Sequence, residues 1–146
     1  MKILHCDGLC EPNPGQGTWA FVVIENGQTI HEDHGDSGAE TTNNVAEYDG
    51  FIKALEWIEQ EGITEPITLF SDSKLVINQS SGQWDCHTDH LRPFVDRAKS
   101  LRVKLGNVAV AYVKGIENEA DEWTRVAFEE ITGKPAALKY KTYGKR

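Results

Sequence analysis

The alternation of hydrophobic and polar positions near the start of the chain predicts three consecutive β-strands. The first covers residues 1–7, where every second side chain lies on the same face and Asp7 stands at the end. The second and third cover residues 19–24 and 28–33, and the Asn-Gly pair between them favours a type I′ hairpin turn. Proline and glycine residues at 11–17 predict a turn that connects the first strand to this hairpin.

A helical period follows a predicted polar loop over residues 36–42. Residues 43–61 carry apolar side chains at intervals of about three to four positions, and Gly62 favours a C-terminal stop. The same reasoning predicts a strand over 67–71, helices over 73–79 and 88–105, a strand over 107–113 and a helix over 117–131. The strand over 107–113 is almost continuously apolar, which is typical of a strand covered on both faces. The order βββ-α-β-α-α-β-α predicts one α/β domain.

Composition agrees with a folded domain. The chain has 146 residues, of which 39% are apolar and 26% are charged, as in soluble globular proteins. No apolar run approaches the ~18 residues of a membrane span, and the polar start offers no secretory signal. Three cysteines cannot all pair within one chain, which favours a reducing compartment. We expect a cytoplasmic monomer with no membrane partner.

The net charge of -8 is unevenly distributed. Residues 133–146 contain five basic and no acidic residues, so residues 1–132 carry -13. An acidic body binds nucleic acid only where local basic patches or metal ions offset its carboxylates. We therefore divide the chain into a domain over 1–132 and a basic tail over 133–146. The tail is either a disordered end, or a segment that lies over the domain or along nucleic acid.

Four carboxylates occupy positions that differ from an ordinary solvated face. Asp7 and Asp72 each end a predicted strand. Glu47 lies on the apolar side of the long helix, and Asp121 lies early in the last one. Burying a carboxylate costs free energy unless it is paired or binds a metal. Each acid taken singly also has a structural explanation, because Asp72 suits a helix N-cap and the other two helical acids suit a first turn.

The contexts of these acids resemble a known family. They are Asp7-Gly8-x-Cys10-x-x-Asn13-Pro14-Gly15-x-Gly17-x-Trp19-Ala20, Thr42-Asn43-Asn44-x-Ala46-Glu47-Tyr48, Ser71-Asp72-Ser73-x-x-Val76 and Asn118-Glu119-Ala120-Asp121-Glu122. The acids are 40, 25 and 49 residues apart. In this order, and interleaved with the matching strands and helices, the four segments resemble type 1 ribonuclease H over about residues 1–131.

This resemblance implies a ribonuclease H-like fold, a five-stranded mixed sheet flanked by helices with the first strand at its centre. It also implies an endoribonuclease that hydrolyses the RNA strand of RNA–DNA hybrids and leaves 5′-phosphate and 3′-hydroxyl ends. Carried over, the four acids converge where the first and fourth strands meet. Asp7 bridges two Mg²⁺ ions, Glu47 and Asp72 complete one site, and Asp121 completes the other, with Mn²⁺ as a substitute. Mg²⁺ prefers oxygen ligands, and two ions ~3.5–4 Å apart activate water and stabilise a leaving oxygen.

The resemblance also implies residues that contact the substrate. Asn13, Asn43 and Asn44 match positions that contact RNA 2′-hydroxyls, and a side-chain amide both donates and accepts hydrogen bonds as a hydroxyl requires. Thr42 is a candidate to hold a phosphate of the DNA strand. The structural alternatives are turn propensity for Asn13 and a helix N-cap for Asn43.

Two features depart from the family pattern. Many members carry a histidine in a loop before the final aspartate, whereas residues 91–146 contain none. Glu117, four residues before Asp121, is a candidate for a comparable place, or else an exposed first-turn acid. Some members also insert a basic, tryptophan-rich helix where this chain has only residues 82–87. Trp84 either stacks on a DNA sugar or is a partly buried anchor of this loop, and the usual burial of tryptophan favours the anchor.

Other functions stay open at this point. They are a hybrid-binding module that does not cleave, a nuclease of the same fold that acts also on double-stranded RNA or branched DNA, and the nuclease domain of a longer polymerase. The four acids favour cleavage, because carboxylates held together without metal repel one another. The chain begins at Met1 and spans all four motifs, so a free-standing enzyme is the simplest expectation. Cys86, His87 and His90 are zinc-type donors, but they number only three and lack paired spacing.

Overall fold

The structure, a computed structural model, describes residues 1–137. Its strands are β1 (Lys2–Glu11), β2 (Gly15–Glu25), β3 (Gln28–Thr41), β4 (Ile67–Ser71) and β5 (Val108–Tyr112). Its helices are α1 (Asn43–Gln60), α2 (Lys74–Ser80), α3 (Arg92–Leu105) and α4 (Asp121–Thr132), with short 3₁₀ helices at Asp89–Leu91 and Gly115–Glu117. Most of the predicted basic tail, including four of its five charges, lies outside the described residues.

The strands form one mixed sheet in the order β3-β2-β1-β4-β5, so β1 is central as predicted. β1 pairs antiparallel with β2 and parallel with β4. Asn26 and Gly27 have φ angles of 53° and 77°, which confirms the predicted type I′ turn between β2 and β3. The predicted five-stranded α/β fold is therefore confirmed.

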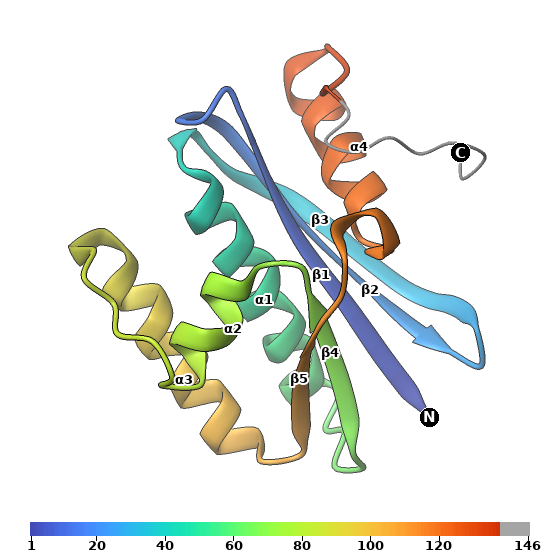
Figure 1. Ribbon diagram of the computed structural model, residues 1–146. Helices are drawn as coiled ribbons and strands as arrows, with labels where there is room; N and C mark the ends of the chain where they lie inside the picture. The colour runs from blue at the N-terminus through green and yellow to red at the C-terminus, as the bar shows by residue number, and fades with distance from the viewer. Residues whose placement is uncertain (138–146) are drawn as a thin grey trace.

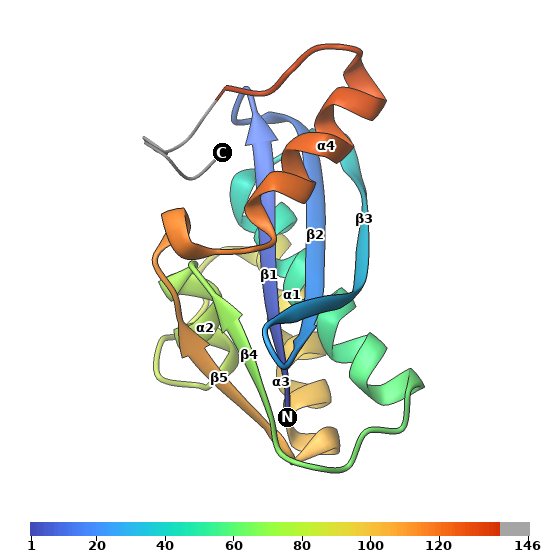
Figure 2. The ribbon, with the colours of Figure 1, turned by 90° about the vertical axis from the view of Figure 1, so that its right-hand side faces the viewer.

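Helices cover both faces of the sheet. α1, α2 and α3 lie on one side, and α4 lies alone on the other side, across β1, β2 and β3 (Figures 1 and 2). The main core forms between the sheet and the three-helix layer, and its largest fully buried apolar side chains include Tyr48, Phe21, Phe51, Leu4 and Leu55. Burial of each such side chain stabilises the fold by roughly 1.5–3 kcal/mol. None of the helices within residues 1–137 is long and apolar enough to cross a bilayer.

The predicted polar loop over residues 36–42 is wrong, because β3 continues to Thr41. This part of β3 pairs with the start of β2, from Thr18 opposite Asp36 to Gly15 opposite Thr41, with register shifts at irregular positions. Backbone hydrogen bonds hold such an extension whatever the side chains are, so polarity alone does not reveal it.

The last strand and the start of the last helix also differ from the prediction. β5 is not covered on both faces: it is an edge strand that pairs with β4 alone, and its residues are half-buried or exposed. The last helix begins at Asp121 rather than at residue 117, because the chain first forms a 3₁₀ turn and then an extended residue, Asn118, with φ -78° and ψ 112°.

A histidine on β3 links the sheet to α4. His34 lies 2.8 Å through Nε2 from Glu130 on α4, and its Nδ1 contacts Glu32 on its own strand. The imidazole also stacks on Trp123, with 5.8 Å between ring centroids. Partial burial lowers the pKa of His34, but the hydrogen bonds and charges of Glu32 and Glu130 outweigh it and raise the pKa above its usual value.

We expect this contact to make stability depend on pH. The pKa of His34 is higher in the folded protein than in the unfolded chain, where it is about 6.5, so the added stability is full below that value. It is lost as the pH rises through the folded pKa. His34→Gln should therefore lower the melting temperature at about pH 5.5 more than at about pH 8.5, by up to about 1 kcal/mol of unfolding free energy. Replacement of the exposed His87 is the control, and an equal effect at both pH values would contradict this assignment.

Candidate active site

The site is built around Asp7, which lies in the central strand β1 and is 1% exposed. The backbone N–H of Gly8 donates to Asp7 Oδ1 at 2.9 Å. The same N–H donates to Oε1 of Glu47 on α1. One backbone donor therefore ties the two carboxylates together.

Two glycines permit this approach of α1 to β1. A Cβ atom on Gly8 would lie 2.3 Å from backbone atoms of Ala46 and Glu47. A Cβ atom on Gly50 would lie 2.4 Å from the carbonyl oxygen of Asp7. Any side chain at either position would push the helix away from the strand, because the atoms in contact are backbone atoms. These glycines set the distance between Glu47 and Asp7.

Asp72 reaches the same place from β4. The parallel register puts Ser71 opposite Cys6, so the residues that follow in the two strands, Asp72 and Asp7, lie at neighbouring strand positions. The chain then turns at once into α2, because Ser73 accepts from the N–H of Val76 at 3.2 Å as an N-cap. Asp72 is thus not the cap residue.

These three acids form a cluster. Within residues 1–137, Asp7, Glu47 and Asp72 each offer a carboxylate oxygen that lies within 4.8 Å of the others, and this is the one group of three or more metal-type side chains so arranged. Burial raises the pKa of the neighbouring Cys6 thiol well above its usual value, and the charges of Glu47, Asp7 and Asp72 raise it further. The cluster therefore generates a strongly negative local field.

The fourth predicted acid, Asp121, lies outside this three-residue set. It is buried at the start of α4, and its Oδ2 accepts from Arg125 Nη2 at 3.2 Å, one helical turn later. The resemblance implied that all four acids converge. Three of them have carboxylate oxygens within 4.8 Å of one another, and Asp121 is not among these three. Arg125 offsets the charge of the fourth.

Asn118 fastens the start of α4 to the strand that carries Asp7. Its side chain is 1% exposed, its Nδ2 donates to the carbonyl of Cys6 at 2.9 Å, and its Oδ1 accepts from the N–H of Ala120 at 3.0 Å. A second hydrogen bond joins the same two segments, because His5 Nδ1 accepts from the N–H of Glu119 at 3.0 Å. Asn118, as part of its motif, was visible in the sequence, but its structural role was not predicted. Arg125 had only its i,i+4 spacing from Asp121 as a signal.

The predicted substrate residues gather where the β1–β2 turn meets α1. Asn13 Oδ1 accepts from the backbone N–H of Asn43 at 3.0 Å, so these two predicted residues lie side by side. Thr42 is the N-cap of α1 and accepts from Val45 N at 3.4 Å. The alternative role of Asn43 as the helix cap is therefore wrong. Asn13 and Asn44 are exposed.

The predicted accessory residues are separate from the cluster. Glu117 is exposed in a 3₁₀ turn, and Trp84 is 47% exposed, so its ring is only partly buried. A backbone hydrogen bond from Trp84 N to the carbonyl of Asn78 at 3.0 Å holds its loop. Cys86, His87 and His90 form no metal-type group among the described residues.

Known proteins share this architecture. The crystal structure of ribonuclease H1 from the archaeon Halobacterium salinarum has a TM-score of 0.81 and 31% identity, covering 88% of this chain and 98% of that one. LC11 ribonuclease H1, solved in complex with an RNA/DNA hybrid, has a TM-score of 0.82 and 26% identity, covering 90% of this chain and 99% of that one.

Sequence relatives agree with the structural ones. Ribonuclease HI of Halobacterium salinarum is 34% identical over 127 residues, which cover 86% of this chain and 63% of the relative. A bifunctional protein of Mycobacterium tuberculosis is 33% identical over 141 residues, which cover 94% of this chain and 38% of the relative. The chain thus spans less than two thirds of the length of these curated relatives. The RNase H family model matches residues 1–128, and the chain therefore belongs to the ribonuclease H family, as a type 1 member.

Proposed function

We propose that this chain is an endoribonuclease that hydrolyses the RNA strand of RNA–DNA hybrids and leaves 5′-phosphate and 3′-hydroxyl ends. The observation that carries the proposal is the cluster of Asp7, Glu47 and Asp72, whose carboxylate oxygens lie within 4.8 Å of one another. The cluster lies where β1 continues past the end of β4, so Asp7 is inside β1 and does not end it, contrary to the prediction from the sequence. Family membership supports it, and so does the structural neighbour that was solved with a hybrid.

The carboxylate cluster fits divalent metal ions. It supplies hard oxygen donors, and three negative charges held this close repel one another until a cation lies between them. We propose Mg²⁺, with Mn²⁺ as a substitute, in a two-ion site to which Asp7 would contribute a ligand for both ions. Glu47 and Asp72 would hold one ion and Asp121 the other. When bound, the ions would activate the attacking water and stabilise the leaving 3′-oxygen.

The chain's own groups hold this arrangement in place before any substrate arrives. The Gly8 N–H orients Asp7 and Glu47 through two hydrogen bonds, so neither carboxylate needs to reorganise when cations bind. Asn118 holds the start of α4, from which Asp121 would reach the site. Preorganised ligands of this kind lower the cost of reaching the transition state.

Substrate contacts are proposed for the β1–β2 turn and the start of α1. Asn13, Asn43 and Asn44 would contact separate 2′-hydroxyls of the RNA strand. The Thr42 hydroxyl accepts a hydrogen bond from Val45 N. Its own hydrogen can still be donated, and we propose that it is donated to a phosphate of the DNA strand. Trp84 and Glu117, both exposed, remain candidates for a DNA sugar contact and for the role of the missing loop histidine.

The remaining parts of the proposal concern the whole chain. We propose that residues 1–132 form the catalytic domain, that residues 133–146 form a basic tail, and that the protein acts as a monomer. The three cysteines are free, which suits the reducing cytoplasm we propose for it. Action on double-stranded RNA is the second candidate, since amide contacts to 2′-hydroxyls do not by themselves require a DNA strand.

A substrate panel tests the proposed function. Labelled RNA–DNA hybrid, double-stranded RNA, double-stranded DNA and single-stranded RNA are each incubated with the protein and Mg²⁺, Mn²⁺ or EDTA. We expect cleavage of the hybrid with either metal and none with EDTA. Cleavage of double-stranded RNA at a similar rate would favour the second candidate. Tight binding of the hybrid with no cleavage under any metal condition would identify a binding module instead.

We expect a single ribonucleotide embedded in DNA to be cut poorly. If Asn13, Asn43 and Asn44 contact separate 2′-hydroxyls, a lone ribonucleotide keeps only one of these contacts, and each lost hydrogen bond costs roughly 0.5–1.5 kcal/mol. Two lost bonds correspond to roughly a 5- to 150-fold lower kcat/KM. Comparing DNA strands that carry from one to several consecutive ribonucleotides measures this, and efficient cutting at one ribonucleotide would refute the contact assignment.

A further inference from the structure

We propose that Lys74, Tyr112 and Lys114 form a second contact surface for the hybrid, one that binds its sugar–phosphate backbone beside the carboxylate cluster. We call these three residues the lysine–tyrosine surface. The inference rests on the proposed function. It identifies the part of the protein that the substrate contacts beyond the cluster, on the side of β4 and β5.

The sheet register brings this surface next to the cluster. Tyr112, the last residue of β5, pairs with Ser71, the last residue of β4, and the N–H of Val113 donates to the Ser71 carbonyl at 3.0 Å. Asp72 follows Ser71 directly. Lys114 comes two residues after Tyr112, and Lys74 begins α2 two residues after Asp72. Both lysines are therefore placed by the backbone that also positions Asp72.

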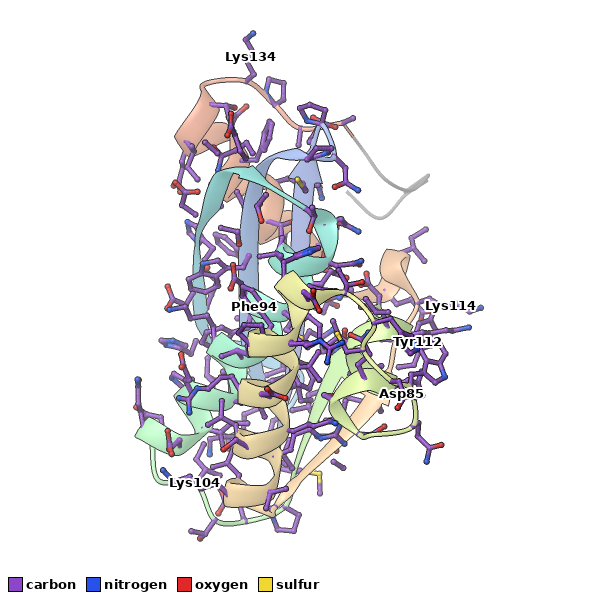
Figure 3. All side chains as sticks on the ribbon, turned by 90° about the vertical axis from the view of Figure 1, so that its left-hand side faces the viewer. Asp85, Phe94, Lys104, Tyr112, Lys114 and Lys134 are labelled. Carbon is purple, nitrogen blue, oxygen red and sulfur yellow. The ribbon has the colours of Figure 1, made fainter. Side chains whose placement is uncertain are left out.

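The ammonium group of Lys74 lies at the surface and near the ring of Tyr112. Lys74 Nζ lies 5.1 Å from the centroid of the Tyr112 ring, a cation–π contact. The Tyr112 side chain is 47% exposed, and both lysines are exposed. Figure 3 shows Tyr112 and Lys114 on the same flank of the molecule, pointing outward, far from Lys104 at the end of α3.

Neither lysine of this surface forms an ion pair within the described part of the protein. Neither Lys74 nor Lys114 lies within 4.0 Å of an acidic side chain in residues 1–137, whereas Lys2 pairs with Glu25 and Lys104 with Glu59. In a chain of net charge -8, two lysines that have no acidic partner among residues 1–137 and lie beside an acidic cluster are suited to a partner that carries negative charge.

A nucleic-acid backbone matches both components of this surface. Each lysine that neutralises a phosphate releases condensed counterions, which drives binding without reading the base sequence. The exposed face of Tyr112 offers an apolar platform of the kind on which sugars and bases pack. A strand that passes over Asp72 meets this surface next, because Ser71 and Tyr112 are paired.

Steady-state kinetics on the hybrid in Mg²⁺ test the inference. We compare the wild type with the double variant Lys74→Gln/Lys114→Gln, with Tyr112→Ala and Tyr112→Phe, and with Lys104→Gln as a control that removes one exposed lysine elsewhere. KM and kcat are measured at KCl concentrations from about 0.05 M to about 0.3 M. Circular dichroism establishes that each variant is folded.

We expect KM of the double variant to rise by roughly sixfold per lost phosphate contact at about 0.1 M KCl, because a log–log slope of ~0.8 per contact is about a factor of six per decade of salt. The salt slope of kcat/KM should fall by about 1.4–1.8, and kcat should change less than about twofold. Tyr112→Ala should raise KM and Tyr112→Phe should restore it, since the ring is retained.

The outcomes separate this inference from the proposed function. Wild-type cleavage of the hybrid, with the same KM and salt slope in the double variant, would overturn the lysine–tyrosine surface and leave the proposed function standing. An equal rise in KM in Lys104→Gln would also overturn it, because the effect would then reflect net charge alone. A wild type that binds the hybrid without cutting it would overturn the proposed function, while a weaker, less salt-dependent affinity of the double variant would still support the surface.

Discussion

An Asp7→Asn variant is expected to lose cleavage of the hybrid by roughly 10³-fold or more, with the fold intact. Asp7 is the acid closest to the centre of the sheet, and it shares the Gly8 N–H with Glu47. A neutral amide is a poor ligand for Mg²⁺, and loss of several kcal/mol of metal-dependent stabilisation corresponds to a factor of this size. The asparagine Oδ1 can still accept from Gly8, so the local backbone contact survives.

The same change should leave the melting temperature of the metal-free protein unchanged or raise it, because it removes one of three like charges that lie within 4.8 Å. Asp96→Asn, on the exposed side of α3, is the matched control for an aspartate-to-asparagine change away from the cluster. Turnover by Asp7→Asn close to that of the wild type at saturating Mg²⁺ would remove Asp7 from the metal site.

An Asn118→Ala variant is expected to lose about 2–4 kcal/mol of unfolding free energy and, where it is still folded, much of its activity. The change leaves the buried Cys6 carbonyl and the Ala120 N–H without their side-chain partner, and each such group costs roughly 1–3 kcal/mol. It also frees the start of α4, and with it Asp121. Urea unfolding and kcat, measured at a temperature where the variant is folded, test both parts.

Asn107→Ala is the matched control. Asn107 also donates through Nδ2 to two backbone carbonyls, those of Ile63 and Glu65. It lies just before β5, away from the cluster of carboxylates. We expect it to lower stability without lowering kcat in the folded protein. If folded Asn118→Ala turns over like the wild type, the position of Asp121 does not depend on Asn118 or does not matter for the reaction.

Local patterns were sufficient to predict the positions of three acids. Period-two alternation put Asp7 in the first strand, the apolar run at 67–71 put Asp72 just beyond another strand, and the helical period put Glu47 on the buried side of α1. Such patterns work because one face of each element must be removed from water, and that requirement is written in neighbouring residues. The resemblance to ribonuclease H then connected the three.

Polar residues with distant partners could not be interpreted in this way. His34 contacts Glu130 and Trp123 across 96 and 89 positions of the chain. Neither contact follows from local hydrophobicity, because the partner of a polar or amphipathic side chain is chosen by packing between elements that are far apart in sequence.

The sequence by itself determined the order of the elements through local periodicity and the four acids through motifs that stay together along the chain. The resemblance of these motifs to ribonuclease H then implied that the first strand is central. Only the tertiary structure decided how closely the acids meet. Gly8 and Gly50 let the backbone of α1 touch β1, and Asn118 bonds to Cys6 across 112 positions to hold the start of α4. Asp121 is paired with Arg125 and stays outside the 4.8 Å cluster. These distances are set by backbone atoms and buried hydrogen bonds that form only when remote segments pack together, so no local pattern encodes them.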